Sequence, residues 1–220
     1  MPWVELGDWW LEEIIDDPAY EAVVIPLLIE VLDPQPGHLY LDLGCGEGRV
    51  MRAVAARGAR VIGLDLNERL AKLAPPTVVA RLPSVPFVSD AVDGVFTVLV
   101  LEHVEDHQGL FGETARVTRV GGTFTVVMNH PVWTATGSTP IGDSDGEMLW
   151  RPGDYFTACS TEVESRGQTV TFHHRSMSDL LNAAADAGWS LEQMVERPHH
   201  DTAALPAVPR LLACRWRLLS

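Results

Sequence analysis

The sequence is short of positive charge. Its 220 residues include 16 lysines and arginines against 30 aspartates and glutamates, a formal net charge of −14, and Lys72 is its one lysine. A surface of this sign repels the phosphates of nucleic acids and of anionic lipids. Because no cluster of basic residues interrupts the acidic composition, we expect neither a nucleic acid nor a membrane as a partner.

Cysteines and long apolar runs are also scarce. The three cysteines, Cys45, Cys159 and Cys214, are widely spaced and form no CxxC pair. That usage does not suit a disulfide framework and fits a reducing compartment. The acidic, aromatic N-terminal stretch lacks the basic start of a secretory signal, and no apolar run has the length that spans a bilayer. The sequence therefore predicts a cytoplasmic location.

Apolar patterns along the chain predict alternating strands and helices. Strands are expected over residues 39–43, 59–64, 77–80, 93–101, 123–129, 189–197 and 211–219. Helices are expected over 47–57, from Asn67 to the Pro75-Pro76 pair, from Asp106 to about Arg119, and from Ser176 through Ala187. This alternation is typical of a mostly parallel sheet that is covered on both faces. We interpret residues 1–220 as a single domain.

Two segments do not fit the alternation. Residues 1–36 precede the first strand as an expected helical lid, and residues 130–175 form an expected cap that contains a hairpin turning at Arg166-Gly167. Both segments are rich in aromatic residues, namely Trp9, Trp10, Tyr20, Trp133, Trp150, Tyr155 and Phe156. These rings either fix the segments to the core or close over a ligand, and the sequence leaves both readings open.

Three glycines follow the first strand in the stretch LDLGCGEG, residues 41–48. In sheets of this kind, ligands bind beyond the carboxyl ends of the strands, and glycine lets backbone amides approach a ligand without an intervening Cβ. Asp65 ends the second strand, where its carboxylate can accept hydrogen bonds from both hydroxyls of a ribose. The combination predicts a nucleoside site.

The details argue against a dinucleotide. A G-x-G-x-x-G fingerprint needs a glycine where this sequence has Arg49. Asp42, directly before the loop, would repel a pyrophosphate but attract an amino group. We therefore expect a ligand that carries a ribose and a cation and no phosphate.

These features resemble the class I S-adenosylmethionine-dependent methyltransferases, in particular the members that act on small molecules. The resemblance rests on LDLGCGEGR (41–49), VIGLD ending at Asp65, DGVFTVLVLEHVED (93–106), ARVTRVGGTFTV (115–126) and RSMSDLLNAAADAGW (175–189). It implies a Rossmann-like α/β fold, a three-layer α/β/α sandwich with a seven-stranded, mostly parallel sheet whose last strand runs antiparallel.

The resemblance also implies S-adenosylmethionine as cofactor and S-adenosylhomocysteine as product. The cofactor-binding residues that it implies are Tyr20, Asp42, Gly44, Cys45, Gly46, Asp65, Leu66, Arg81, Leu82, Leu101 and Glu102. Among these, Asp42 is expected at the amino end, Asp65 at the ribose, and Leu101 and Glu102 beside the sulfonium. Alignment of Val85-Pro86-Phe87 with the family places Arg81 where similar proteins have an acidic residue, so adenine is expected to rely on backbone groups and leucines.

Methyl transfer to a hydroxyl needs a general base, whereas an amine or an activated carbon needs only positioning. His103, two residues beyond the strand 93–101, is the leading catalytic candidate, and His130, which ends the strand 123–129, is the second. A histidine that only shapes the pocket through a backbone hydrogen bond is the alternative for His103. His103 and His107 have no acidic third ligand at a suitable spacing, so no metal site is expected.

The expected acceptor site comprises Trp10, His103, His130, Trp133, Tyr155 and His173. The main hypothesis is methyl transfer to oxygen, nitrogen or carbon of a small, largely apolar or aromatic acceptor. Rival hypotheses are a non-methylating member of the same fold and a nicotinamide-dependent oxidoreductase, which Arg49 and Asp42 disfavour. A protein or RNA methyltransferase is disfavoured by the net charge and the compact length.

Overall fold

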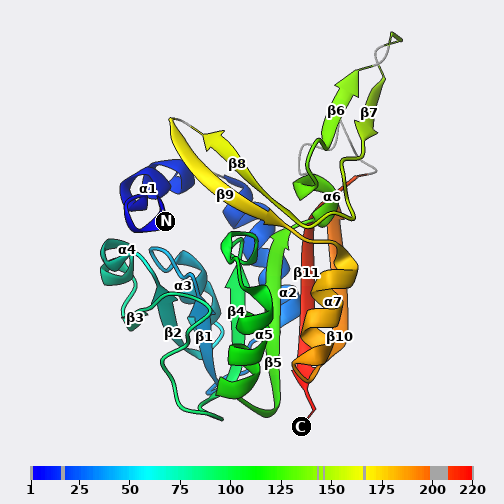
Figure 1. Ribbon diagram of the computed structural model, residues 1–220. Coiled ribbons are helices and arrows are strands. Elements are labelled where there is room, and N and C mark those ends of the chain that lie inside the picture. Colours follow the sequence, from blue (N-terminus) through cyan, green and yellow to red (C-terminus); the bar gives the residue numbers. More distant parts are fainter. Residues whose placement is uncertain are drawn as a thin grey trace.

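A computed structural model gives the fold of residues 2–15, 18–142, 144–145, 147–165, 167–198 and 208–219, which are the described part of the chain. Its centre is a seven-stranded sheet in the order β10–β11–β5–β4–β1–β2–β3 (Figure 1). The strands are β1 (Leu39–Leu43), β2 (Arg60–Asp65), β3 (Thr77–Val79), β4 (Val92–Val98), β5 (Thr118–Asn129), β10 (Trp189–Pro198) and β11 (Pro209–Leu218).

The strands from β1 to β5 in this sheet pair in parallel, and β11 runs antiparallel to both β5 and β10. The expected fold class, a mostly parallel sheet whose last strand is antiparallel, is therefore confirmed. Because β1, β2 and β4 are parallel neighbours, their carboxyl ends meet at one edge, and the segments that follow them are brought together there.

Helices cover both faces of the sheet (Figure 1). On one face, α5 (His107–Val117) and α7 (Met177–Asp186) pack against a core that contains Phe124, Trp189 and Trp216. On the other face, α2 (Ile25–Leu32) and α3 (Arg49–Ala55) pack against a core that contains Phe96 and Val127. The remaining helical segments are α1 (Gly7–Ile15), α4 (Glu68–Leu73), α6 (Pro131–Thr134) and the short turns η1 (Pro2–Val4), η2 (Tyr20–Val24) and η3 (Leu101–His103).

Side-chain caps start three of these helices where the sequence predicted a start. Asn67 accepts hydrogen bonds at the start of α4, Asp106 does so at α5, and Ser176 forms a capping box with Asp179 at α7. Among the described residues, no helix combines the length and the apolar character needed to cross a membrane.

The strand expected over 123–129 begins earlier, at Thr118. Two further predicted boundaries were wrong for backbone reasons. The helix expected over 47–57 begins only at Arg49, because Gly48 takes a left-handed conformation with φ of 85°. The strand expected over 93–101 ends at Val98, because Leu99 has φ of 55° and turns the chain into η3. Because β4 ends three residues earlier than expected, Leu101 and Glu102 lie in η3 and not at the end of a strand.

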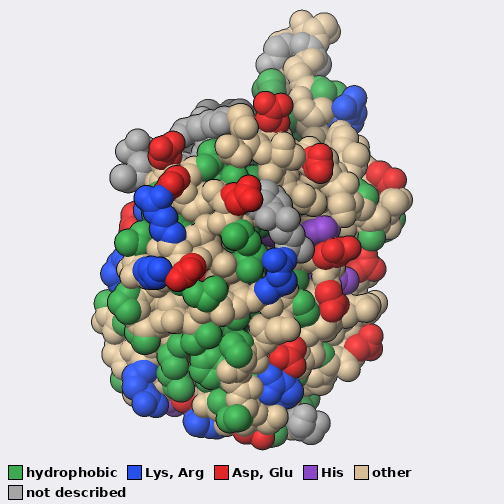
Figure 2. All heavy atoms as spheres, turned by 60° about the vertical axis from the view of Figure 1, so that its left-hand side comes forward, with side chains coloured by type: hydrophobic (Ala, Val, Ile, Leu, Met, Phe, Trp, Pro, Cys, Tyr) green, Lys and Arg blue, Asp and Glu red, His purple; other side chains and the backbone are tan. Residues whose placement is uncertain are grey.

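The insertion between residues 130 and 175 contains two hairpins. One, formed by β6 (Thr139–Gly142) and β7 (Met148–Arg151), projects from the body of the protein (Figures 1 and 2). The other, formed by β8 (Cys159–Ser165) and β9 (Gln168–His174), extends toward α1 (Figure 1). The predicted hairpin is thus present, and Arg166 of its expected turn lies outside the described residues.

Candidate functional site

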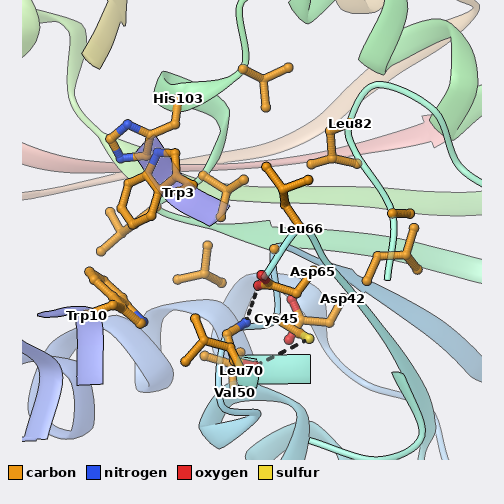
Figure 3. A pocket seen from close by; sticks show the side chains of 18 of the residues that line it. Trp3, Trp10, Asp42, Cys45, Val50, Asp65, Leu66, Leu70, Leu82 and His103 are labelled. Carbon is orange, nitrogen blue, oxygen red and sulfur yellow. Dashed lines mark hydrogen bonds between the residues drawn. The ribbon is translucent and has the colours of Figure 1, made fainter. Parts of the chain in front are cut away.

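A pocket of about 270 Å³ opens at the carboxyl ends of β1, β2 and β4. The glycine loop after β1, the end of β2, residues 80–83 and the turn after β4 form its walls. Trp3 and Trp10 of the N-terminal segment close it on one side (Figure 3). The carboxylates of Asp42 and Asp65 therefore lie on one side of the pocket, and the rings of Trp3, Trp10 and His103 lie on the other (Figure 3).

The glycine loop takes a conformation that side chains disfavour. Gly44 has φ of 76° and Gly46 has φ of 54°. A Cβ on Gly44 would lie 2.5 Å from Cγ2 of Val100, and a Cβ on Gly46 would lie 3.3 Å from Nε1 of Trp10. The sequence interpretation ascribed these glycines to the close approach of a ligand. For Gly44, the structure gives another reason, namely a left-handed backbone packed against the Val100 side chain.

Asp42 is the most deeply buried charged group of the pocket. Its side chain is 1% exposed, and Oδ2 has no hydrogen-bond partner among the described residues. Burial raises the pKa of the Asp42 carboxyl well above its ordinary value, and the nearby charges of Asp65 and Glu47 raise it further. A cationic group in the pocket would supply both the missing partner and the opposite charge.

Asp65 is oriented by two backbone amides. Its Oδ2 accepts from the N–H of Gly46 at 2.8 Å, and its Oδ1 accepts from the N–H of Asn67 at 2.7 Å. Burial raises the pKa of Asp65, and these hydrogen bonds oppose the rise. Because a carboxylate oxygen accepts more than one hydrogen bond, both oxygens retain capacity for hydroxyl donors. The carboxylate is thus fixed in place for a diol.

His103 lies at the aromatic end of the pocket. Its ring centre is 4.9 Å from that of Trp3 and 4.6 Å from that of Phe172, which lies on β9. Nδ1 is 2.8 Å from the carbonyl oxygen of Thr171. Since a carbonyl can only accept, Nδ1 carries a proton and Nε2 is the nitrogen that can take one up. The ring therefore combines a backbone anchor with a potential base.

The comparisons with known proteins agree with this geometry. Residues 41–126 match a protein family described as "Methyltransferase domain". An uncharacterised methyltransferase of Mycobacterium leprae (strain Br4923) is 34% identical over 165 residues, 71% of this chain and 59% of the relative. The ubiquinone biosynthesis O-methyltransferase of Hahella chejuensis (strain KCTC 2396) is 30% identical over 145 residues, 56% of this chain and 58% of the relative.

A solved structure, that of an S-adenosylmethionine dependent methyltransferase from Mesorhizobium loti, has a TM-score of 0.74 at 26% identity and covers 87% of this chain and 96% of that one. Both comparisons are consistent with the class I S-adenosylmethionine-dependent methyltransferase family. The cofactor implied by the sequence, S-adenosylmethionine, is that of the family. The two curated relatives are longer, and the aligned part of the chain spans 59% and 58% of their lengths.

The residues of the pocket fit this cofactor. Oδ2 of Asp42 has no hydrogen-bond partner among the described residues and is available to the amino group of the cofactor. The two oxygens of Asp65 are held by backbone amides and are available to the ribose hydroxyls. Leu66 and Leu82 are half-buried pocket residues that offer apolar surface to a planar base. Arg81, which occupies the position where similar proteins have an acidic residue, is exposed at the edge of the pocket. The fit is therefore clear for the amino end and the ribose and rests on apolar packing at the adenine.

Most of the expected site residues are brought together in this one pocket. It is lined by Tyr20, Asp42, Gly44, Cys45, Gly46, Asp65, Leu66, Arg81 and Leu82 of the expected cofactor set and by Trp10 and His103 of the expected acceptor set. The ring of Tyr20, which was expected to contact the cofactor, already contacts a cation of the protein, because the guanidinium of Arg49 lies 5.6 Å from its centre. Whether each of these residues binds a ligand stays a prediction.

Leu101 and Glu102 lie behind the pocket wall and are fully buried. Oε1 of Glu102 accepts a hydrogen bond from the side-chain amide (Nδ2) of Asn129 at 2.7 Å, so the carboxylate faces the end of β5. Leu99 and Val100 line the pocket instead. The expected positions were displaced because β4 ends earlier than the sequence pattern predicted.

His130 does not face the pocket, contrary to the expectation. Its Nδ1 accepts from the N–H of Val132 at 3.1 Å, where it caps α6, and its Nε2 lies 2.8 Å from Oε1 of Glu196. Burial lowers the pKa of His130, and the neighbouring Glu196 carboxylate opposes that change. Because both ring nitrogens have protein partners, the geometry gives His130 a structural role.

Three further acceptor candidates do not line the pocket and instead make contacts within the insertion or between the insertion and α7. Trp133 packs against Trp150 with ring centres 4.3 Å apart. The Tyr155 hydroxyl accepts from the N–H of Met177 at 3.0 Å, and Nδ1 of His173 lies 2.8 Å from Oγ of Ser160. In the described residues, the insertion reaches His103 through Thr171 and Phe172.

Sequence reasoning missed several residues of this site. Trp3 belongs to the same acidic, aromatic N-terminal stretch as Trp10, so the composition of that stretch was a usable signal for it. Asn67 was recognised only as a helix cap. Phe172 lies on a hairpin whose placement over His103 depends on the fold, and no local pattern identifies it.

Proposed function

We propose that the protein transfers the methyl group of S-adenosylmethionine to a small, largely apolar or aromatic acceptor held beside Trp3, Trp10 and His103. The observation that carries this proposal is the polarity of the pocket. Asp42 and Asp65 form an acidic end that suits an ammonium and a ribose, and the opposite end is aromatic (Figure 3). A methyl acceptor of apolar character fits the aromatic end.

When bound, the cofactor supplies a methyl group that its sulfonium already activates. The residues of this chain then have three tasks, which are to hold the two ligands in line, to exclude water and, for a hydroxyl acceptor, to remove a proton. Orientation and desolvation can together lower a barrier by several kcal/mol. The pocket's rings and its half-buried aliphatic side chains support the exclusion of water.

His103 is the proposed general base for a hydroxyl acceptor. The Thr171 carbonyl fixes the Nδ1–H tautomer, so Nε2 is the basic nitrogen. The rings of Trp3 and Phe172 both pack against the imidazole. For an amine or carbon acceptor, the same ring acts only as part of the wall.

Several observations support a small-molecule acceptor over a macromolecule. On the face shown in Figure 2, basic side chains are dispersed among acidic ones and form no continuous strip. The net charge of −14 opposes binding to a phosphate backbone. The relative from Hahella chejuensis is named for ubiquinone biosynthesis, which favours an aromatic acceptor. We further propose a cytoplasmic location, with residues 1–36 as a lid and residues 130–175 as a cap within one domain.

The proposal is tested by calorimetry followed by a transfer assay. S-adenosylhomocysteine should bind, and NADH should not. Labelled S-adenosylmethionine should then methylate members of a panel that contains catechols, naphthols, aromatic amines and quinol precursors. Binding of S-adenosylhomocysteine without transfer to any acceptor would indicate a non-methylating member of the fold, and binding of NADH alone would indicate an oxidoreductase.

A further inference from the structure

Asn67 uses all of its polar atoms to join three parts of the pocket. The residue is 5% exposed, and its backbone N–H donates to Oδ1 of Asp65 at 2.7 Å. Its Oδ1 accepts from the N–H groups of Arg69 and Leu70 at 3.0 and 3.1 Å and so caps α4. Its Nδ2 donates to the carbonyl oxygens of Trp3 and Val4 at 3.1 and 3.0 Å. One residue, through its backbone N–H and its side chain, therefore ties the proposed ribose carboxylate to the N-terminal segment.

The N-terminal segment is closely packed against Asn67. A Cβ on Gly7 would lie 2.7 Å from Nδ2 of Asn67, which leaves no room for a methyl group. An ion pair between Asp8 and Arg69 joins the same two parts at the surface. Both contacts connect residues of the segment with the first turn of α4.

The other side of this segment forms the aromatic end of the pocket. The Trp3 ring lies 6.0 Å from that of Trp10 and 4.9 Å from that of His103, centre to centre. All three rings line the pocket. Phe172 of β9 packs against His103 as well, so the N-terminal segment and the β8–β9 hairpin, which extends toward α1 (Figure 1), both contact His103.

We propose that Trp3 is a specificity-determining residue for a planar aromatic acceptor and that Asn67 is the positioning residue that links Trp3 to the occupancy of Asp65. The inference rests on the proposed function. A ribose bound to Asp65 holds the carboxylate that accepts the Asn67 N–H, and Asn67 in turn holds the two carbonyls of the segment. Occupancy of Asp65 by the cofactor should therefore stabilise the acceptor wall that these hydrogen bonds already form.

The coupling is tested by hydrogen exchange of the amides of residues 3–10, with and without S-adenosylhomocysteine at a saturation checked by calorimetry. The ligand should slow exchange in the wild type by about tenfold, the effect of two hydrogen bonds. Asn67→Ser keeps the helix cap, but its hydroxyl is too short to hold both carbonyls. Because the coupling is reciprocal, this variant should lose most of the protection and bind the ligand about tenfold more weakly than the wild type.

A second pair of variants addresses the segment from its own side. Gly7→Ala should displace the segment from Asn67 and reduce the protection, even if Asn67→Ser fails to fold. Gly112→Ala is the matched control, because its helical Cβ would meet nothing within 4 Å and its φ is not positive. Equal protection in the wild type and in Gly7→Ala, or ligand binding without protection in the wild type, would overturn the coupling. Failure of the wild type to bind S-adenosylhomocysteine would instead overturn the proposed function and this inference with it.

The role of Trp3 is tested with 1-naphthol as the probe, by calorimetry on the complex with S-adenosylhomocysteine. Trp3→Ala should weaken binding of the probe about tenfold, and Trp3→Phe should remain within about threefold, because an aromatic ring is retained. The affinity for S-adenosylhomocysteine should be the same in all three proteins. Equal binding of 1-naphthol to all three, or no binding to the wild type, would overturn the assignment of a planar aromatic acceptor to Trp3.

Discussion

The two ends of the pocket are built in different ways. At the cofactor end, Asp42 and Asp65 lie on strands of the parallel sheet, and backbone amides or burial fix their carboxylates. At the acceptor end, Trp3, His103 and Phe172 come from three segments that are far apart in the sequence, and ring contacts hold them together. The first end is therefore rigid by topology, and the second depends on how two peripheral segments dock.

This difference has a chemical consequence. A family that shares one cofactor needs an invariant geometry for the amino group and the ribose, which strand ends provide. Acceptors differ from one member to the next, and peripheral segments can change without disturbing the sheet. Substitutions at the cofactor end should therefore affect binding of S-adenosylhomocysteine, whereas substitutions at the acceptor end should affect turnover and leave that binding intact.

The largest effect is expected for His103→Ala. With a hydroxyl acceptor, kcat should fall on the order of 10²–10⁴-fold, because the proton acceptor is lost. Affinity for S-adenosylhomocysteine should be nearly unchanged. Steady-state kinetics with labelled S-adenosylmethionine measures the first quantity, and calorimetry measures the second. His107→Ala, which removes the histidine that follows the lining residue Asp106 at the start of α5 and does not itself line the pocket, is the matched control and should retain full activity.

An amine or carbon acceptor gives a different signature for the same variant. KM should then rise while kcat changes little, because only packing is lost. A variant with wild-type kcat and KM would show that His103 neither removes a proton nor contacts the acceptor.

The second largest effect is expected for Asp65→Ala at the cofactor end. The loss of a carboxylate that accepts from ribose hydroxyls should weaken binding of S-adenosylhomocysteine by about 100-fold and remove most of the rise in melting temperature that the ligand causes. Asp186→Ala, an exposed carboxylate at the end of α7, should leave both quantities unchanged. A melting shift of wild-type size in Asp65→Ala would mean that the ribose binds elsewhere.

The contrast between the two ends also explains what the sequence could predict. Asp42, Gly46 and Asp65 were identified because the apolar runs of the sequence show where strands end. In a parallel sheet, the carboxyl ends of neighbouring strands lie at one edge. The seven strands and the antiparallel last strand followed from the family resemblance. Errors at this end were small and came from single backbone conformations, such as the positive φ of Leu99 that displaced Leu101 and Glu102.

The acceptor end was harder to predict for a physical reason. Aromatic rings attach a peripheral segment to the rest of the protein as readily as they line a pocket, and the sequence does not distinguish the two uses. Trp133 and Tyr155 do the former, whereas Trp3 lines the pocket and Phe172 packs against His103, which also lines it. Only the docking of the segments decides between them, and docking depends on contacts distant in the sequence.

A smaller effect is expected from the ionisation of Asp42. Its pKa is raised in the folded protein, so the folded state binds more protons than the unfolded state between the ordinary aspartate pKa and the raised value. The free energy of unfolding of the free protein should therefore fall as pH rises through the raised pKa. A cofactor ammonium favours the ionised carboxylate, so the Kd for S-adenosylhomocysteine should increase as pH falls through the same range.

Calorimetry in two buffers of different ionisation enthalpy checks this linkage, because binding should release a proton below the raised pKa. Asp42→Asn should abolish the release and weaken binding about tenfold, the effect of one charged hydrogen bond. Proton release that is undiminished in Asp42→Asn would assign the linkage to another group, with Asp65 as the next candidate.

The smallest effect is expected for His130→Ala, which lies outside the pocket. The variant removes the cap of α6 and the contact with Glu196, so the free energy of unfolding in urea should fall by about 1 kcal/mol. Turnover and binding of S-adenosylhomocysteine should stay within about twofold of the wild type, since the ring contacts neither end of the pocket. Glu196→Ala, which removes the partner carboxylate but keeps the cap, should cost less stability than His130→Ala. A large loss of kcat in His130→Ala at unchanged stability would place the ring in the reaction and contradict the division between the two ends.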